Sequence, residues 1–193
     1  MEYDARTALV IVDVQNDFTD PAGGLYVRGG ETIVAGINHE IERARAAGAL
    51  VVYTQDWHPP STPHFAKDGG IWPVHCVRET WGAELHAELT VAGEVVRKGV
   101  AGEDGYSGFT MRDAATAAEV PTALEGLLRA RDIERVVVVG LAADVCVLDT
   151  ALDALGRGFA TVVLSALTRG VERSPGDTER AFETLAQAGA SVE

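Results

Sequence analysis

Cysteine, long apolar runs and export signals are all scarce or absent in this sequence. It has only two cysteines, Cys76 and Cys146, and they lie far apart. Two such residues do not make a disulfide framework, so we expect reduced thiols in a reducing compartment. No apolar run approaches the ~18–20 residues that a transmembrane helix requires, and the N-terminal residues show no secretory signal. We therefore expect a cytoplasmic protein that does not associate with membranes.

Basic residues are also few compared with acidic ones. The chain has 16 Lys and Arg against 29 Asp and Glu, a net charge of −13. This surplus repels a phosphate backbone, and the basic residues form no cluster that could offset it locally, so we expect no nucleic-acid partner. The 193 residues, 47 % of them hydrophobic, instead suit one folded domain spanning 1–193 with a sizeable core.

Apolar runs alternate with amphipathic stretches along the chain, which indicates an α/β fold. Continuous apolar runs are typical of strands buried on both faces, and apolar stripes at helical spacing predict the helices between them. The predicted strands are 7–14, 50–54, 94–97, 135–141, 160–164 and 190–192, and the predicted helices are 32–47, 122–130, 145–157 (capped by Asp144) and 177–188. We predict a doubly wound, mostly parallel six-stranded sheet with helices on both faces.

Sheets of this kind hold their sites beyond the carboxyl ends of the strands. One stretch that follows such an end, residues 55–80, lacks periodicity and holds three of the five histidines and two of the three tryptophans. Irregular segments this long are uncommon in compact domains and are usually functional. We therefore expect residues 55–80 to contribute to a site.

A metal site is predicted within this stretch. Asp56 and His58 directly follow a strand, and residues two apart in extended backbone face the same side. His64 and His75 lie in the same stretch and could fold back to join them. One Asp with two or three imidazoles suits a divalent ion such as Zn²⁺, Fe²⁺ or Mn²⁺. The alternative is surface histidines flanked by prolines, with Asp56 as a turn former.

Three more candidates stand at other strand ends. Asp13 interrupts an apolar run, and burying its carboxylate is costly unless it caps loop amides or serves as a base near a cation. Cys146 opens a helix, whose free amides can stabilise a thiolate or an oxyanion; otherwise it is a small packed hydrophobe. Lys98 ends a short strand, where a surface lysine is the ordinary alternative. Together they match the base, cation and nucleophile of covalent amide cleavage.

Six segments of the chain resemble, in order, those of nicotinamidases in the isochorismatase-like hydrolase superfamily. They are VDVQNDF (12–18), TQDWHPPSTPHF (54–65), WPVHCV (72–77), the Lys98-Gly99 pair, YSGF (106–109) and GLAADVCV (140–147). The resemblance spans nearly the whole chain. Its Asp-x-His and WPxHCV elements point to the metal-dependent nicotinamidase/pyrazinamidase branch, since isochorismatases proper usually lack the nucleophilic cysteine and the metal ligands.

The resemblance implies a cysteine amidohydrolase that converts nicotinamide to nicotinate and ammonia through a thioester, and that also accepts pyrazinamide. It implies a catalytic triad of Asp13, Lys98 and Cys146, and an oxyanion hole from the backbone amides of Ala142 and Cys146 beside a cis bond between Leu141 and Ala142. One divalent metal ion (Zn, Fe or Mn) would be held by Asp56, His58, His64 and His75. Phe18 and Trp72 would sandwich the pyridine ring, with Tyr106 lining the pocket.

The chain departs from the family at Ala143, where Thr is common; the change removes a hydroxyl but no catalytic group. Two alternative functions stay open: another cysteine amidohydrolase of the superfamily acting on an N-carbamoyl or ureido substrate, and an inactive ligand-binding homologue. The aromatic pair and the metal ligands argue against the first, and the complete triad argues against the second. A redox role for Cys146 lacks a nearby resolving cysteine. A homo-oligomer is compatible with the sequence.

Overall fold

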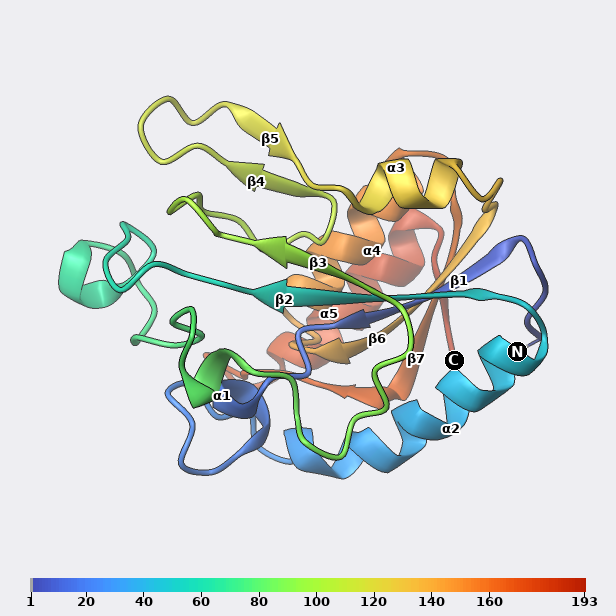
Figure 1. Cartoon of the computed structure of the whole chain (residues 1–193), viewed down its shortest axis with the longest axis horizontal. Helices are drawn as coiled ribbons and strands as arrows, with labels where there is room; N and C mark the ends of the chain where they lie inside the picture. Colours follow the sequence, from blue (N-terminus) through green and yellow to red (C-terminus); the bar gives the residue numbers. More distant parts are fainter. Residues whose placement is uncertain (1) are drawn as a thin grey trace.

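A six-stranded parallel sheet forms the centre of the molecule in the computed structural model, which describes residues 2–193 (Figure 1). Its strands are β1 (Thr7–Val12), β2 (Leu50–Asp56), β3 (Glu94–Lys98), β6 (Arg135–Leu141), β7 (Ala160–Arg169) and β8 (Ser191–Val192). Their order is β3-β2-β1-β6-β7-β8, and each neighbouring pair is parallel. The predicted α/β architecture and its six strands are therefore confirmed.

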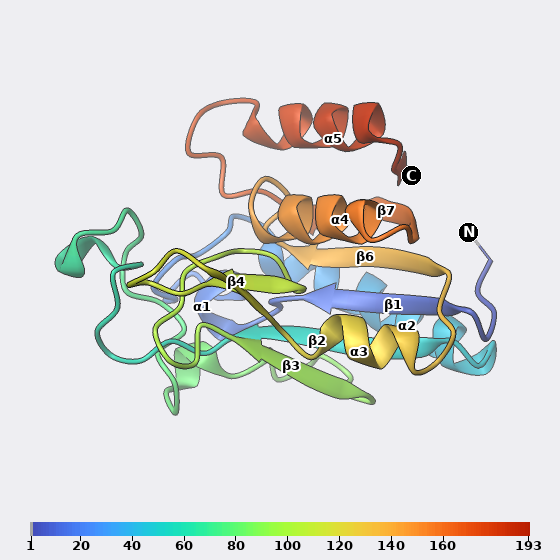
Figure 2. The same ribbon diagram turned by 90° about the horizontal axis from the view of Figure 1, so that it is seen from above.

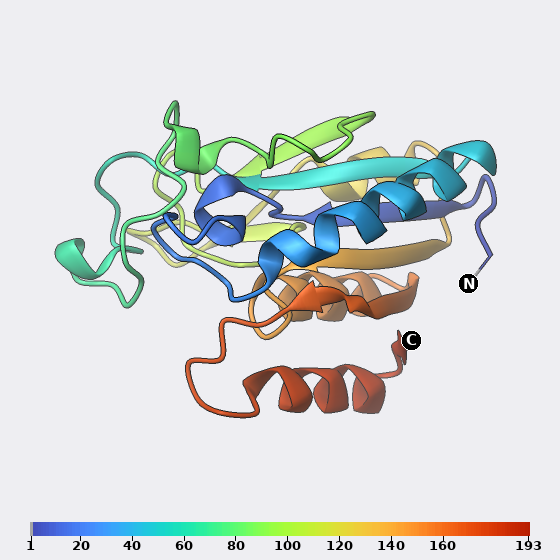
Figure 3. The ribbon, with the colours of Figure 1, turned by 90° about the horizontal axis from the view of Figure 1, so that it is seen from below.

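Helices cover both faces of this sheet. Figure 2 shows α3 (Leu124–Arg129) and α4 (Cys146–Gly156) over one face, with α5 (Asp177–Ala188) beside α4, and Figure 3 shows α2 (Val34–Ala46) across the other. The short helix α1 (Asn16–Thr19) and three 3₁₀ segments, η1 (Gly30–Ile33), η2 (Ala66–Asp68) and η3 (Trp81–Ala83), lie in the connections. Among residues 2–193, no helix is both long and apolar enough to cross a membrane.

The burial of strand β1 explains why its sequence is apolar from Ala8 to Val12. Its residues are all buried, and successive side chains enter opposite layers. Leu9 and Ile11 pack with α2, whereas Ala8 and Val10 pack with α3 and α4. Each fully buried Val, Leu or Ile side chain contributes about 1.5–3 kcal/mol to folding. The two layers of the core therefore meet along β1, and the end of this strand is firmly placed.

Some predicted boundaries were wrong. The first strand ends at Val12 because Asp13, with φ +48°, turns the chain out of the sheet. The first helix is preceded by η1, and β7 continues past residue 164 to Arg169 after a register shift against β6. A second sheet, formed by the antiparallel strands β4 (Thr110–Arg112) and β5 (Glu119–Pro121), was not predicted. Its strands have three residues each, too few to show a periodicity.

The prediction that Asp144 caps the following helix was also wrong. The residue at the N-cap of α4 is Val145, and no side chain there accepts a capping hydrogen bond. The carboxylate of Asp144 instead accepts hydrogen bonds from the backbone N–H groups of Val171 and Glu172, each at 2.8 Å. Asp144 therefore holds the segment that follows β7 against the start of α4.

Candidate active site

Four of the predicted site residues lie where neighbouring strands end. Asp13 directly follows β1, Asp56 and Lys98 are the last residues of β2 and β3, and Cys146 begins α4 after β6. These strands are adjacent and parallel in the order β3-β2-β1-β6. Their carboxyl ends consequently meet at one edge of the sheet, and residues more than a hundred positions apart in the chain become neighbours.

The ammonium group of Lys98 lies at the centre of this group. Its Nζ is 2.9 Å from Asp13 Oδ2 and 3.7 Å from Cys146 Sγ, and it also donates a hydrogen bond to the carboxylate of Asp56. Lys98 is 1 % exposed and Asp13 is fully buried. A buried cation in contact with two carboxylates is the arrangement that a charged lysine needs inside a protein. Sulfur, carboxylate and ammonium thus meet at one point.

These contacts shift the pKa values of Lys98, Asp56 and Asp13. Burial disfavours the ammonium form, but the Asp13 and Asp56 carboxylates outweigh it and hold the pKa of Lys98 well above its usual value. Burial likewise disfavours the charged form of Asp56, yet Lys98 holds its pKa well below the usual value. At Asp13, burial prevails over the attraction of Lys98 and raises the pKa of the carboxyl. Asp13 is therefore the more basic of the two carboxylates.

The protonation state of Cys146 is determined more by burial than by its place at the start of a helix. Burial raises its pKa well above the usual value, against the opposing effect of Lys98. The raised pKa favours the neutral thiol at rest, so the sulfur must lose its proton before it can attack. The pKa of the neighbouring Asp13 is also raised, which suits a proton transfer between the two.

Two backbone amides without a hydrogen-bond acceptor among the described residues adjoin the sulfur. The backbone N–H groups of Ala142 and Cys146 donate no hydrogen bond among the described residues, whereas those of Ala143 and Val147 bond to Arg169 and Ala142. The bond between Leu141 and Ala142 is cis, as predicted. Two free amides next to a nucleophile can stabilise the negative oxygen of a tetrahedral intermediate.

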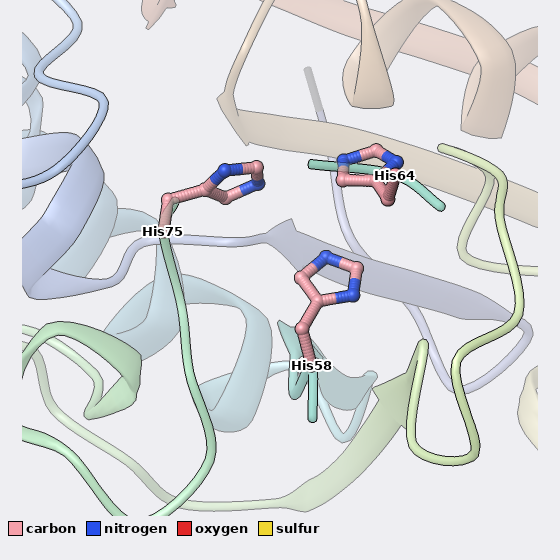
Figure 4. A group of neighbouring side chains, drawn as sticks. All are labelled: His58, His64 and His75. Carbon is pink, nitrogen blue, oxygen red and sulfur yellow. The ribbon is translucent and has the colours of Figure 1, made fainter. Parts of the chain in front are cut away.

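Three histidine rings lie beside the triad. Figure 4 shows His58, His64 and His75 around a common space, and one ring nitrogen from each lies within 4.8 Å of the others. All three side chains are buried. The Oδ2 atom of Asp56 is 3.8 Å from His58 Nε2 and 3.9 Å from His75 Nε2. The carboxylate of Asp56 therefore lies beside two of the three histidine rings.

This cluster fits a metal ion. Both ring nitrogens of His58 are buried without a hydrogen-bond partner among residues 2–193, which is costly unless another group binds them. His75 Nδ1 lies 2.8 Å from the carbonyl oxygen of Pro73, which leaves Nε2 of His75 available. Three imidazoles with one carboxylate form a donor set suited to Zn²⁺, Fe²⁺ or Mn²⁺.

A small cavity borders two of the three histidines and the sulfur. Among its lining residues are Phe18, Asp56, His64, Trp72, His75, Tyr106, Ala142 and Cys146. The indole N–H of Trp72 donates a hydrogen bond to the hydroxyl of Tyr106 at 3.1 Å, which joins two loops at the cavity wall. Aromatic walls with a few polar groups are typical of a site for a small aromatic ligand. Whether Phe18 and Trp72 sandwich a ring stays a prediction.

Sequence reasoning missed two residues that hold the triad and the metal cluster in place. The amide of Gln15 donates to the backbone oxygens of Asp56 and Ala83 and accepts from the N–H of Asp56, each at 2.8 Å. Thr54 Oγ1 donates to Asp13 Oδ1 at 2.6 Å. Both polar residues are fully buried, Thr54 within β2 and Gln15 in the segment after β1. Gln15 lies in the segment VDVQNDF and Thr54 in TQDWHPPSTPHF, so their place in these motifs could have indicated a role in the site.

Glycine is required at position 99 for two reasons. The backbone there has φ +74°, a left-handed conformation that favours glycine. A Cβ atom on Gly99 would also lie 2.5 Å from His58 Nδ1, far inside contact distance. The absence of a side chain therefore lets His58 approach the end of β3.

Comparisons with known proteins identify the family of this chain. The family model for the isochorismatase domain matches residues 7–193. The nicotinamidase of Escherichia coli (strain K12) is 35 % identical over 203 residues, covering 96 % of this chain and 93 % of that protein. PnC1 from L. infantum, crystallised in complex with nicotinate, is 38 % identical with a TM-score of 0.89, covering 100 % of this chain and 95 % of that one. Pyrazinamidase of Pyrococcus horikoshii, crystallised in complex with zinc, is 36 % identical with a TM-score of 0.86, covering 97 % and 98 %.

Proposed function

This chain belongs to the isochorismatase family, and we propose that it is a nicotinamidase that converts nicotinamide to nicotinate and ammonia and also hydrolyses pyrazinamide. One observation carries the proposal. Lys98 Nζ lies between Asp13 and Cys146 Sγ, beside a small cavity with aromatic walls and a histidine cluster at its edge. A nucleophile, its base and a site for one aromatic ring are thus in contact.

The first half of the reaction forms a thioester. Asp13 takes the proton of the Cys146 thiol, and the thiolate attacks the carboxamide carbon of the substrate. The carbonyl oxygen becomes negative and accepts hydrogen bonds from the free N–H groups of Ala142 and Cys146. One donor of this kind lowers the barrier by about 3–4 kcal/mol. Lys98 stays positively charged and keeps the acid and the sulfur close together.

The second half releases the products. Asp13 returns its proton to the leaving nitrogen, the carbon–nitrogen bond breaks, and ammonia departs. Water then adds to the thioester carbon, with Asp13 as the base that accepts its proton. The carbon–sulfur bond breaks, the sulfur recovers a proton, and nicotinate leaves with one oxygen from water.

The substrate ring is oriented by the cavity walls. Phe18 and Trp72 hold its two faces, and Tyr106 closes one side. His58, His64, His75 and Asp56 would hold a divalent ion, which would supply a Lewis-acidic position at the edge of the cavity. Cys146 lines the same cavity, so a ring held between Phe18 and Trp72 directs its carboxamide towards the sulfur.

Ammonia release from a panel of amides tests the proposal. The purified protein with its metal should hydrolyse nicotinamide and pyrazinamide with kcat/KM at least about 100-fold higher than a ring-free carboxamide, because aromatic contacts align the ring. Preference for an N-carbamoyl or ureido compound would identify a different amidohydrolase of the family. Release of ammonia from none of them would indicate an inactive ligand-binding homologue.

Replacing His58 by alanine should remove the metal. The variant loses a ring whose two nitrogens have no hydrogen-bond partner among the described residues, so the wild type should retain about one ion per chain after dialysis and the variant almost none. Metal content is measured by elemental analysis. His39→Ala is the matched control because His39 is exposed on α2. Full metal content in His58→Ala would contradict the proposed ligand set.

A further inference from the structure

The side chain of His64 is bound by a carboxylate from another segment. Its Nδ1 lies 2.7 Å from Asp104 Oδ1, and the histidine ring is almost wholly buried while Asp104 is partly exposed. An ionised carboxylate can only accept, so the proton of the neutral ring stays on Nδ1. The lone pair is then on Nε2, the nitrogen free to bind a metal.

Asp104 is itself held by the second sheet. Its backbone N–H donates to Arg112 O at 2.8 Å, and the N–H of Arg112 donates back to Asp104 O at 2.5 Å. The guanidinium of Arg112 also lies 3.8 Å from Asp104 Oδ2. Arg112 is the last residue of β4. The small sheet β4–β5 therefore fixes the position of the carboxylate that meets His64.

The three histidines differ in how they are oriented. His75 has a carbonyl oxygen of its own loop as a partner, and the ring nitrogens of His58 have none among the described residues. His64 depends on a charged side chain forty positions away. Its ring also stacks on that of His58, with centroids 4.7 Å apart and planes at 20°. A histidine in an irregular loop needs such a hydrogen bond to keep a single ring orientation.

We propose that Asp104 is a positioning residue of the metal site, which holds His64 as the Nδ1–H tautomer and directs Nε2 towards the space shared with His58 and His75. The proposal rests on the metal-dependent function proposed above. Outer carboxylates of this kind orient ligand histidines and increase their basicity. Asp104 thereby links the Gly-rich segment 99–105 to the metal ion, although it contacts neither the ion nor the substrate.

Zinc affinity of the full-length apoprotein tests this role. Zn²⁺ alone is titrated in competition with a chromophoric chelator. Asp104→Ala should weaken the affinity about 10- to 100-fold, and Asp104→Asn should weaken it less because its amide oxygen still accepts a hydrogen bond. Glu103→Ala is the matched control, since Glu103 bonds to the backbone N–H of Ala101 instead. Its affinity should equal that of the wild type.

Two further measurements separate positioning from a general loss of structure. In a double-mutant cycle, Asp104→Ala should have no additional effect on zinc affinity once His64 is replaced by alanine. Nitrogen NMR of the zinc-loaded protein should show a proton on Nδ1 of His64 in the wild type and a mixture of tautomers in Asp104→Ala.

The outcomes distinguish this proposal from the function on which it rests. A wild type that binds zinc, together with an Asp104→Ala variant within twofold of it, would overturn the positioning role alone. An equal loss with and without His64 would also overturn it, because Asp104 would then act elsewhere. A wild type that binds no zinc would overturn the metal-dependent function and the positioning role together.

Discussion

Cys146→Ala is expected to lower kcat for nicotinamide hydrolysis by roughly 10⁴-fold or more while the metal content stays unchanged. The variant removes the only sulfur that lies against Lys98 and the free amides among the described residues, so no thioester can form. Loss of a nucleophile that acts together with its base is of this order. Ammonia release gives the rate, and elemental analysis of the dialysed protein gives the metal content.

The second cysteine supplies the control for this experiment. Cys76 is buried like Cys146, but its sulfur has the carbonyl oxygen of Gly82 as its partner at 4.0 Å. Cys76→Ala should therefore retain activity within about tenfold, with some loss of stability from the lost sulfur. A Cys146→Ala variant with turnover near that of the wild type would refute the nucleophile assignment.

Lys98→Met is expected to lower the free energy of unfolding by about 3–5 kcal/mol, as well as to abolish activity. Methionine has a similar length but no charge, so Asp13 and Asp56 would remain buried without their cation. Removing one partner of a buried ion pair is costly for this reason. Urea unfolding of the metal-free protein, compared with the metal-free wild type, measures the difference.

An exposed lysine provides the matched substitution. Lys67 pairs with Asp68 at 2.8 Å, but its side chain is 45 % exposed. Lys67→Met should therefore change the free energy of unfolding by less than about 1 kcal/mol. If Lys98→Met were as mild as Lys67→Met, the two buried carboxylates would not depend on the ammonium group, and the proposed charge arrangement would be wrong.

The sequence was sufficient to predict the central sheet and the grouping of the site. Apolar runs such as residues 135–141 can only be buried, and their alternation with helical stripes leaves few arrangements besides a parallel sheet. The carboxyl ends of parallel strands share an edge, so Asp13, Lys98 and Cys146 were predictable neighbours. The motif segments supplied the rest of the site, including the cis bond before Ala142.

The supporting contacts were not predictable from local pattern. Asp144 has the residue type of a helix cap, but its carboxylate bonds to amides that follow β7 instead. Asp104 stands in a polar stretch that resembles any solvated loop, and its role depends on β4 and on the distant His64. The side-chain amide of Gln15, in the segment after β1, bonds to the backbone of Asp56 at the end of β2. Each partner is remote in the chain, where periodicity carries no information.

The order of strands in the central sheet has a consequence for how activity returns during refolding. The reacting groups come from the ends of β3, β1 and the segment after β6, and β2 lies between the first two. Contacts between distant parts of a chain form slowly because long loops must close first. A refolding chain therefore regains its helical signal before it can turn over substrate, and the recovery of turnover marks the completion of the native topology.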